Sequence, residues 1–170
     1  MTEGGYISRL EIAQRIAERE KVVSQVKWTR NDCLPTAVAF THGLPADYHK
    51  LGLYARAYVH QAIEASSVLS ERNGENTILY KFEVKDRVQT LKRIDRKLDW
   101  SDKAWIIFGN ENNSHVLGII KLDEDEYMVA NISLDNPYSK MTAGEIADHL
   151  MSYKKYSDLG VCIIGFKKKK

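Results

Sequence analysis

The feature that most constrains the fold is a pair of apolar segments in the second half of the chain, separated by an acidic turn. Residues 115–122 and 127–134 are rich in apolar and β-branched side chains, and the four residues between them, 123–126, are all acidic, with the turn expected at 123–125. Apolar runs on either side of a polar turn are typical of a β-hairpin. Residues 104–108 and 161–166 are further apolar runs of strand length. The sequence therefore predicts an antiparallel sheet in this half.

Helical patterns dominate the first half of the chain. Ser8 and Glu11 have the spacing of a capping box, in which each side chain bonds the other's free backbone amide, and they predict a helix over residues 8–20. Thr142 and Glu145 repeat that spacing ahead of one late helix. Further elements are expected as helices over residues 34–42, 44–69 and 88–98 and a strand over 77–84. Helices followed by an antiparallel sheet with one late helix indicate the α+β class.

Length and composition favour one compact unit. The 170 residues fit one domain rather than two, because typical domains hold about 100–200 residues. We expect a single domain over residues 1–170, in which 1–28 form an N-terminal helix and a connection and 167–170 form a basic tail. Hydrophobic residues make up 44% and charged residues 28% of the chain, which excludes long disorder and fibrous repeats.

The sequence has no signals for secretion or for a membrane span. No apolar run approaches the roughly 20 residues that a membrane helix needs, and the first residues lack the charged and apolar regions of a signal peptide. The two cysteines make no disulfide framework and are expected to be reduced thiols. We therefore expect a cytoplasmic protein, while a secreted effector and a virion protein remain open. Nothing in the sequence predicts an oligomeric state.

The charge pattern gives little reason to expect a nucleic-acid partner. Lys and Arg number 25 and Asp and Glu number 23, so the net charge is only +2. The basic residues at 87–97 are interleaved with Asp86, Asp95 and Asp99, as on a solvated helix face. The histidines and cysteines lack a zinc spacing, and no glycine-rich phosphate loop is present in the sequence. The sequence therefore predicts neither a metal nor a cofactor.

Cys33 is the residue that is most clearly suited to act in catalysis. Pro35 is tolerated only in the first turn of a helix, so Cys33 is expected at a helix N-terminus. The helix dipole and the free amides at that place favour thiolate, which is the nucleophilic form of the side chain. A catalytic cysteine also needs a base, and His115 begins a strand beside a polar loop. Cys162, within an apolar strand, is expected to belong to the core.

A cysteine opening a helix, then His-Val-Leu-Gly-Ile-Ile, then Tyr-Met-Val-Ala-Asn resembles the papain-like cysteine peptidase superfamily. The most similar members are compact ones, the bacteriocin-processing (double-glycine) peptidases and small phage-encoded relatives. The resemblance covers about residues 31–134 and implies a papain-like fold, in which the helix of the nucleophile packs on an antiparallel sheet. It implies Cys33 as nucleophile, His115 as base and Asn131 as the residue that orients the imidazole, with Asp135 as the alternative third residue.

The resemblance implies acyl chemistry on a protein or peptide, and it leaves the reaction open. Peptidases, deamidases and transglutaminases all pass through a thioester. The family often has a glutamine some six residues before the cysteine as oxyanion donor, and Lys27 stands there instead. Gln25 and Asn31 are the side chains that remain as oxyanion candidates. The missing glutamine keeps a second reading open, a non-catalytic protein-binding or effector protein.

The expected hairpin also predicts where the base and its partner lie. With the pairing centred on residue 123, His115 and Asn131 are expected nearly opposite each other on adjacent strands. Directly opposed residues of an antiparallel pair share one face, with Cβ atoms about 4.5–5.5 Å apart. An asparagine at that distance can reach an imidazole nitrogen.

Overall fold

A computed structural model of the chain describes residues 33–42, 59–109, 114–131, 138–154 and 159–170. The helix expected over 8–20 lies outside these residues, as does most of the one expected over 44–69. Three candidate site residues of the sequence also lie outside them, namely Gln25, Asn31 and Asp135.

The centre of the fold is a six-stranded sheet in which every neighbouring pair is antiparallel. The strand order is β1-β6-β2-β3-β4-β5, so the last strand of the chain is inserted between the first two. The strands are β1 (Glu75–Glu83), β2 (Lys103–Gly109), β3 (Ser114–Asp123), β4 (Glu126–Ala130), β5 (Tyr138–Met141) and β6 (Gly160–Lys168). This arrangement brings β3 to the inside of the sheet, between β2 and β4.

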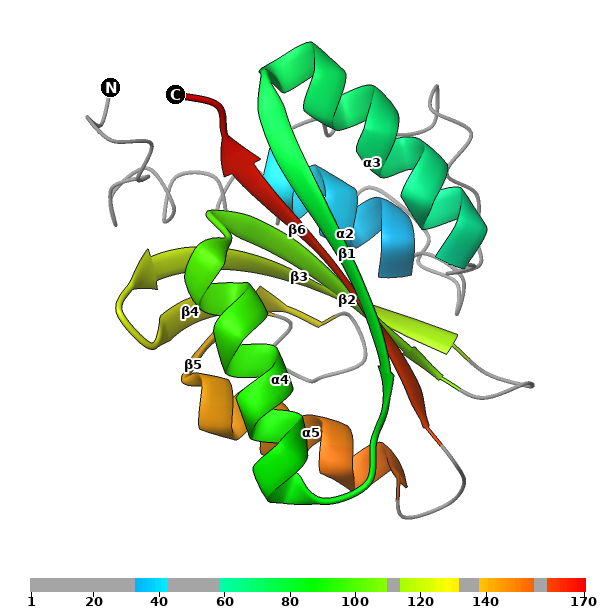
Figure 1. Ribbon diagram of the computed structural model, residues 1–170, viewed down its shortest axis with the longest axis vertical. Coiled ribbons are helices and arrows are strands. Elements are labelled where there is room, and N and C mark those ends of the chain that lie inside the picture. Colours follow the sequence, from blue (N-terminus) through cyan, green and yellow to red (C-terminus); the bar gives the residue numbers. More distant parts are fainter. Residues whose placement is uncertain (1–32, 43–58, 110–113, 132–137, 155–158) are drawn as a thin grey trace.

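Helices cover both faces of the sheet. The described helices are α2 (Cys33–His42), α3 (Val59–Asn73), α4 (Arg87–Trp100) and α5 (Ala143–Lys154). Figure 1 shows α2 and α3 on one side of the sheet and α4 and α5 on the other. The mixture of helices with an antiparallel sheet confirms the α+β class.

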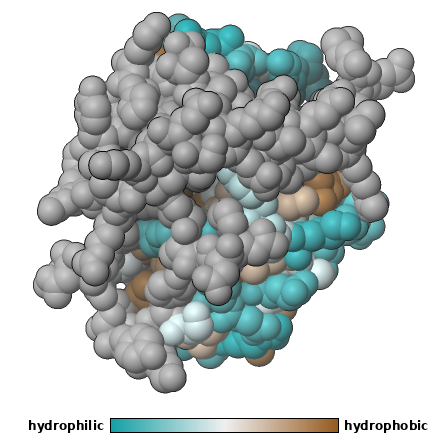
Figure 2. Space-filling model, turned by 180° about the vertical axis from the view of Figure 1, so that it is seen from behind, coloured by the Kyte–Doolittle hydropathy of each residue, from teal (hydrophilic) through white to brown (hydrophobic). Residues whose placement is uncertain are grey.

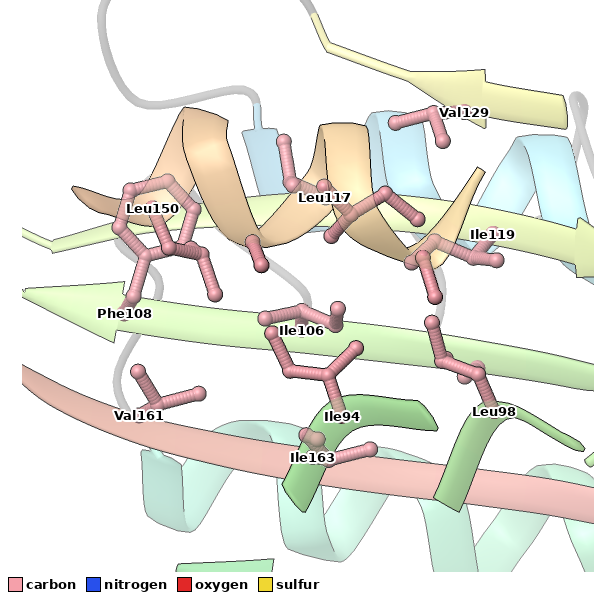
Figure 3. Packing of buried hydrophobic residues seen from close by; sticks show 14 of the residues in the cluster. Ile94, Leu98, Ile106, Phe108, Leu117, Ile119, Val129, Leu150, Val161 and Ile163 are labelled. Carbon is pink, nitrogen blue, oxygen red and sulfur yellow. The ribbon is translucent and has the colours of Figure 1, made fainter. Parts of the chain in front are cut away.

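Three clusters of buried apolar residues lie between these layers, two large ones and a small one of Phe40, Ile120, Ala130 and Tyr138. The first lies between the sheet and the α4/α5 pair, and Figure 3 shows its strand residues gathered around Ile94 and Leu98 of α4 and Leu150 of α5. The second lies between the sheet and the α2/α3 pair and contains Trp105 and Phe166. Because both faces of the sheet are covered, its central strands are apolar on both sides rather than alternating apolar with polar residues.

Local sequence signals set the starts of two helices. The carboxylate of Asp86 accepts a hydrogen bond from the backbone amide of Gln89, which caps α4. The capping box expected before α5 is confirmed: Thr142 N donates to Glu145 Oε1, and Glu145 N donates to Thr142 Oγ1, both at 3.1 Å. These bonds satisfy amides that the helices themselves leave without partners.

The strands differ from the expected ones mainly at their ends. β4 ends at Ala130, whereas the sequence predicted a strand to residue 134. β5 was not expected at all, and it pairs with the outer side of β4. β6 continues to Lys168, so the first two lysines of the expected basic tail belong to the sheet.

The contact between α2 and β3 is unusually close. An added Cβ at Gly118 would lie 2.9 Å from the Cα atom of Ala37, so only glycine leaves room for the helix there. Packing of this kind ties the backbone of α2 directly to the backbone of β3. The expectation of a helix that begins at Cys33 and packs on an antiparallel sheet agrees with this arrangement.

Polar contacts set the direction in which α2 runs. Trp105 Nε1 donates to Thr41 Oγ1 at 2.8 Å, and His42 Nε2 lies 3.1 Å from Glu75 Oε1. Lys103 Nζ contacts the other oxygen of Glu75 at 3.0 Å. Burial raises the pKa of Glu75, but the hydrogen bond to His42 and the charge of Lys103 outweigh it and hold that pKa below its ordinary value. The C-terminal end of α2 is therefore fixed where β2 begins.

The described surface is largely hydrophilic. Figure 2 shows more hydrophilic than hydrophobic colouring where described residues reach the surface on the side seen from behind. Among large apolar side chains, Val68, Leu79 and Val88 are the exposed ones in the described ranges. No helix within those ranges is long and apolar enough to cross a membrane.

Cys162 confirms the expectation of a core cysteine, since it is buried in β6 against the α2/α3 side of the sheet. We expect Cys162→Ala to lower the free energy of unfolding by about 1 kcal/mol or more, because truncation removes buried contacts. Urea unfolding measures this, with Ser67→Ala on the exposed face of α3 as the surface control. Equal unfolding free energies for the two variants would contradict tight packing at Cys162.

Candidate functional site

The backbone of Cys33 begins α2, as the sequence predicted, and its side chain lies outside the described side chains. Thr41 and His42 place the other end of α2 near the start of β2, so the helix runs parallel to β3. Cys33 precedes Ala37 by one helical turn, about 6 Å along the axis. The N-terminus of α2 therefore points to the end of the sheet where β3 begins.

His115 is the second residue of β3, at that same end of the sheet. It pairs with Phe108 of β2, and the two rings meet edge to face with centroids 5.5 Å apart. Phe108 belongs to the core beneath α4 and α5. The imidazole of His115 thus lies on the sheet face that these two helices cover.

Asn131 follows β4 directly and is buried. Its Oδ1 lies 2.6 Å from His115 Nε2, so the predicted contact between the two side chains is present. The predicted register is wrong, however. Gly118 pairs with Ala130, which centres the hairpin on residue 124 and sets Asn131 two residues away from the position opposite His115. A shift of two residues preserves the face, and the bond runs diagonally across the strands.

His149 of α5 is a member of this cluster that sequence reasoning missed. Its Nε2 lies 2.8 Å from Asn131 Nδ2, so the asparagine amide bridges two imidazoles. One signal in the sequence pointed to it: His149 lies three residues after the buried Ile146, and residues at that spacing share a face of a helix. That spacing turns His149 toward the sheet.

The amide of Asn131 determines which ring nitrogen of His115 carries the proton. An amide oxygen only accepts hydrogen bonds, so with Oδ1 facing His115 the Nε2–H must donate. In the neutral ring, Nδ1 is then the basic nitrogen. Burial lowers the pKa of His115, and the hydrogen bond to Asn131 opposes part of that change. The arrangement supplies an oriented neutral base.

The imidazole and α2 lie on opposite faces of the sheet. Val116, the neighbour of His115 in β3, packs in the core under α2 and α3, whereas Leu117 packs under α4 and α5. His115 shares the side of Leu117 because alternate residues of a strand share a face. β3 begins at Ser114, one residue before His115. A direct contact between Cys33 and His115 therefore requires the thiol to reach around this end of β3.

The structure does not describe the other candidate residues of the sequence. Gln25, Asn31 and Asp135 lie outside the described residues, so the oxyanion candidates and the alternative third residue stay predictions. Within the described ranges, no group of three or more His, Cys, Asp or Glu side chains is arranged to hold a metal ion. No protein-family model and no curated protein matches this chain.

Proposed function

We propose that this protein performs cysteine-nucleophile acyl chemistry on a peptide or isopeptide bond, as a thiol peptidase-like hydrolase acting on proteins or peptides in the cytoplasm. The observation that carries the proposal is the hydrogen bond of 2.6 Å between His115 and Asn131, at the sheet end toward which the N-terminus of α2 points. The resemblance to papain-like peptidases supports the same three residues and their order in the chain.

The reaction assigns one step to each residue. The Cys33 thiol gives its proton to His115 Nδ1, and its sulfur bonds to the substrate carbonyl carbon. The bond from carbon to the leaving nitrogen breaks, and the imidazolium returns the proton to that nitrogen. Water then hydrolyses the thioester and regenerates the thiol. Asn131 keeps the imidazole oriented through both steps. Deamidation and transamidation follow the same path and differ in the leaving group or in the final acceptor.

A second function, a protein-binding protein without catalysis, is favoured by one specific observation. The imidazole of His115 faces α5, while α2 covers the opposite face of the sheet. In such a protein the half-buried cluster of His115, Asn131 and His149 joins β3, β4 and α5 and has a structural role. Cys33 is then an ordinary thiol.

Alkylation of Cys33 by iodoacetamide, followed by mass spectrometry across a pH series, separates the two functions. An activated nucleophile is expected to react with a midpoint well below the ordinary thiol pKa of about 8.5. Cys162 is an internal reference, because burial raises the pKa of its thiol. Slow alkylation of Cys33 with an ordinary midpoint would favour the binding protein.

Substitutions in the pair show whether the imidazole activates the thiol. His115→Ala is expected to raise the midpoint of Cys33 alkylation toward the ordinary value, and Asn131→Ala to raise it less, because the base is misoriented rather than removed. With a peptide substrate, Asn131→Ala should lower kcat more than it changes KM. An identical pH profile in His115→Ala and the unmodified protein would exclude the imidazole as the base.

A further inference from the structure

The described structure joins His115, Asn131 and His149 in one chain of hydrogen bonds. The residues come from β3, from the position after β4, and from α5. His115 Nε2 lies 2.6 Å from Asn131 Oδ1, and Asn131 Nδ2 lies 2.8 Å from His149 Nε2. The asparagine thus contacts one imidazole through its oxygen and the other through its nitrogen.

An asparagine amide has nearly the same shape when it is turned by 180° about its last bond. What distinguishes the two orientations is whether each neighbour accepts or donates. A neutral His149 whose Nε2 has a lone pair accepts the Nδ2–H of Asn131 and disfavours the reversed amide. Burial lowers the pKa of His149, and the charge of a protonated His115 lowers it further, so the neutral ring is favoured.

Reversal of the amide would change the base itself. With Nδ2 facing His115, the Nε2 of His115 would have to accept, and the ring proton would move to Nδ1. Nδ1 is the nitrogen that receives the thiol proton in the proposed reaction. The wrong orientation of Asn131 would therefore leave His115 in a tautomer that cannot accept the proton there.

We propose that His149 is a positioning residue, which accepts the Asn131 amide hydrogen and thereby holds His115 in the Nε2–H tautomer. Contacts elsewhere fix α5 so that His149 stays in place. The capping box of Thr142 and Glu145 closes its first turn, and Ala143 N donates to Asp125 Oδ1 of the hairpin at 2.9 Å. The effect of this tautomer on the reactivity of Cys33 rests on the proposed function. The role of His149 in setting the tautomer of His115 does not depend on it.

Nitrogen-15 NMR of the full chain, labelled at histidine and recorded at a pH where the rings are neutral, measures the tautomer directly. The unmodified protein is expected to show His115 with its proton on Nε2. His149→Leu removes the acceptor that His149 provides, and the ratio of Nε2–H to Nδ1–H tautomer is expected to fall by roughly tenfold, because one hydrogen bond that favours the present orientation of the amide is lost. His149→Glu supplies an acceptor without a donor and is expected to restore the ratio.

The control is Asp148→Asn, which changes the neighbouring exposed residue of α5 and should leave the tautomer unchanged. An Nδ1–H tautomer in the unmodified protein would overturn the proposal even if no variant folded. It is equally overturned if His149→Leu keeps the Nε2–H tautomer, since His149 would then have a packing role only. If His149→Leu changes the tautomer of His115 but leaves the pH profile of Cys33 alkylation unchanged, His149 is a positioning residue and the proposed acyl chemistry is rejected.

Discussion

Cys33→Ala is expected to abolish thiol-dependent acyl transfer while the protein remains folded. In the proposed reaction the Cys33 sulfur is the atom that bonds to the substrate, so the reaction cannot proceed once the side chain is shortened. The position at the start of α2 favours thiolate through the helix dipole and the amides of the first turn. The measurement is the burst of p-nitrophenol from p-nitrophenyl acetate, which reports acylation of a nucleophile without knowledge of the natural substrate.

The matched control for this experiment is Cys162→Ala. Burial raises the pKa of the Cys162 thiol, and the charge of Lys81 offsets only part of that rise, so this thiol is a poor nucleophile. We expect the burst to persist in Cys162→Ala, with one p-nitrophenol released per molecule, and to vanish in Cys33→Ala. A burst of equal size in both variants would remove Cys33 as the nucleophile.

The hairpin shows how far sequence patterns reach. The apolar runs and the acidic turn predicted the hairpin of β3 and β4, and the papain-like resemblance singled out His115 and Asn131, whose contact is present. The register was missed by two residues because a pattern locates a turn only approximately. The pairing is also irregular between Lys121 and Asp123, where the ladder shifts before the turn closes. An irregularity of that kind depends on backbone geometry and leaves no mark in residue type.

The face to which His115 points could not be predicted for a different reason. β3 carries apolar residues on both sides, because helices cover both faces of the sheet. Alternation between apolar and polar residues, the usual guide to the buried face, is therefore missing. The same covering by α5 brought His149 into the site. The helical spacing of His149 indicated that it faces inward, but the residue that it contacts depends on how α5 packs on the sheet.

β5 was missed because its formation depends on its neighbour. The strand has only four residues, and they neither alternate nor form an apolar run. It forms as an edge strand because the outer backbone N–H and C=O groups of Tyr127 to Ala130 in β4 pair with it. By contrast, the capping box of α5 was predictable because its two hydrogen bonds join residues three positions apart.

Gly118→Ala is expected to lower the free energy of unfolding by about 1–3 kcal/mol, the usual cost of forcing extra atoms into a packed core. The new Cβ would lie 2.9 Å from the Cα of Ala37 and 3.2 Å from its carbonyl oxygen. Those are backbone atoms, so no side-chain rotation relieves the contact, and α2 must move away from β3. Gly118→Val should cost more, because its branched side chain extends further into the helix.

Gly160→Ala is the matched control, a glycine at the start of β6 where an added Cβ would meet only Gly109 O, at an ordinary 3.8 Å. Urea unfolding of the three variants compares their stabilities, and coinciding curves for Gly118→Ala and Gly160→Ala would contradict the close approach of α2 to β3.

The substitution at Gly118 also tests whether the position of α2 affects the reactivity of Cys33. Because α2 carries Cys33 at its N-terminus, a displaced helix should slow Cys33 alkylation in the folded protein, whereas Gly160→Ala should leave it unchanged.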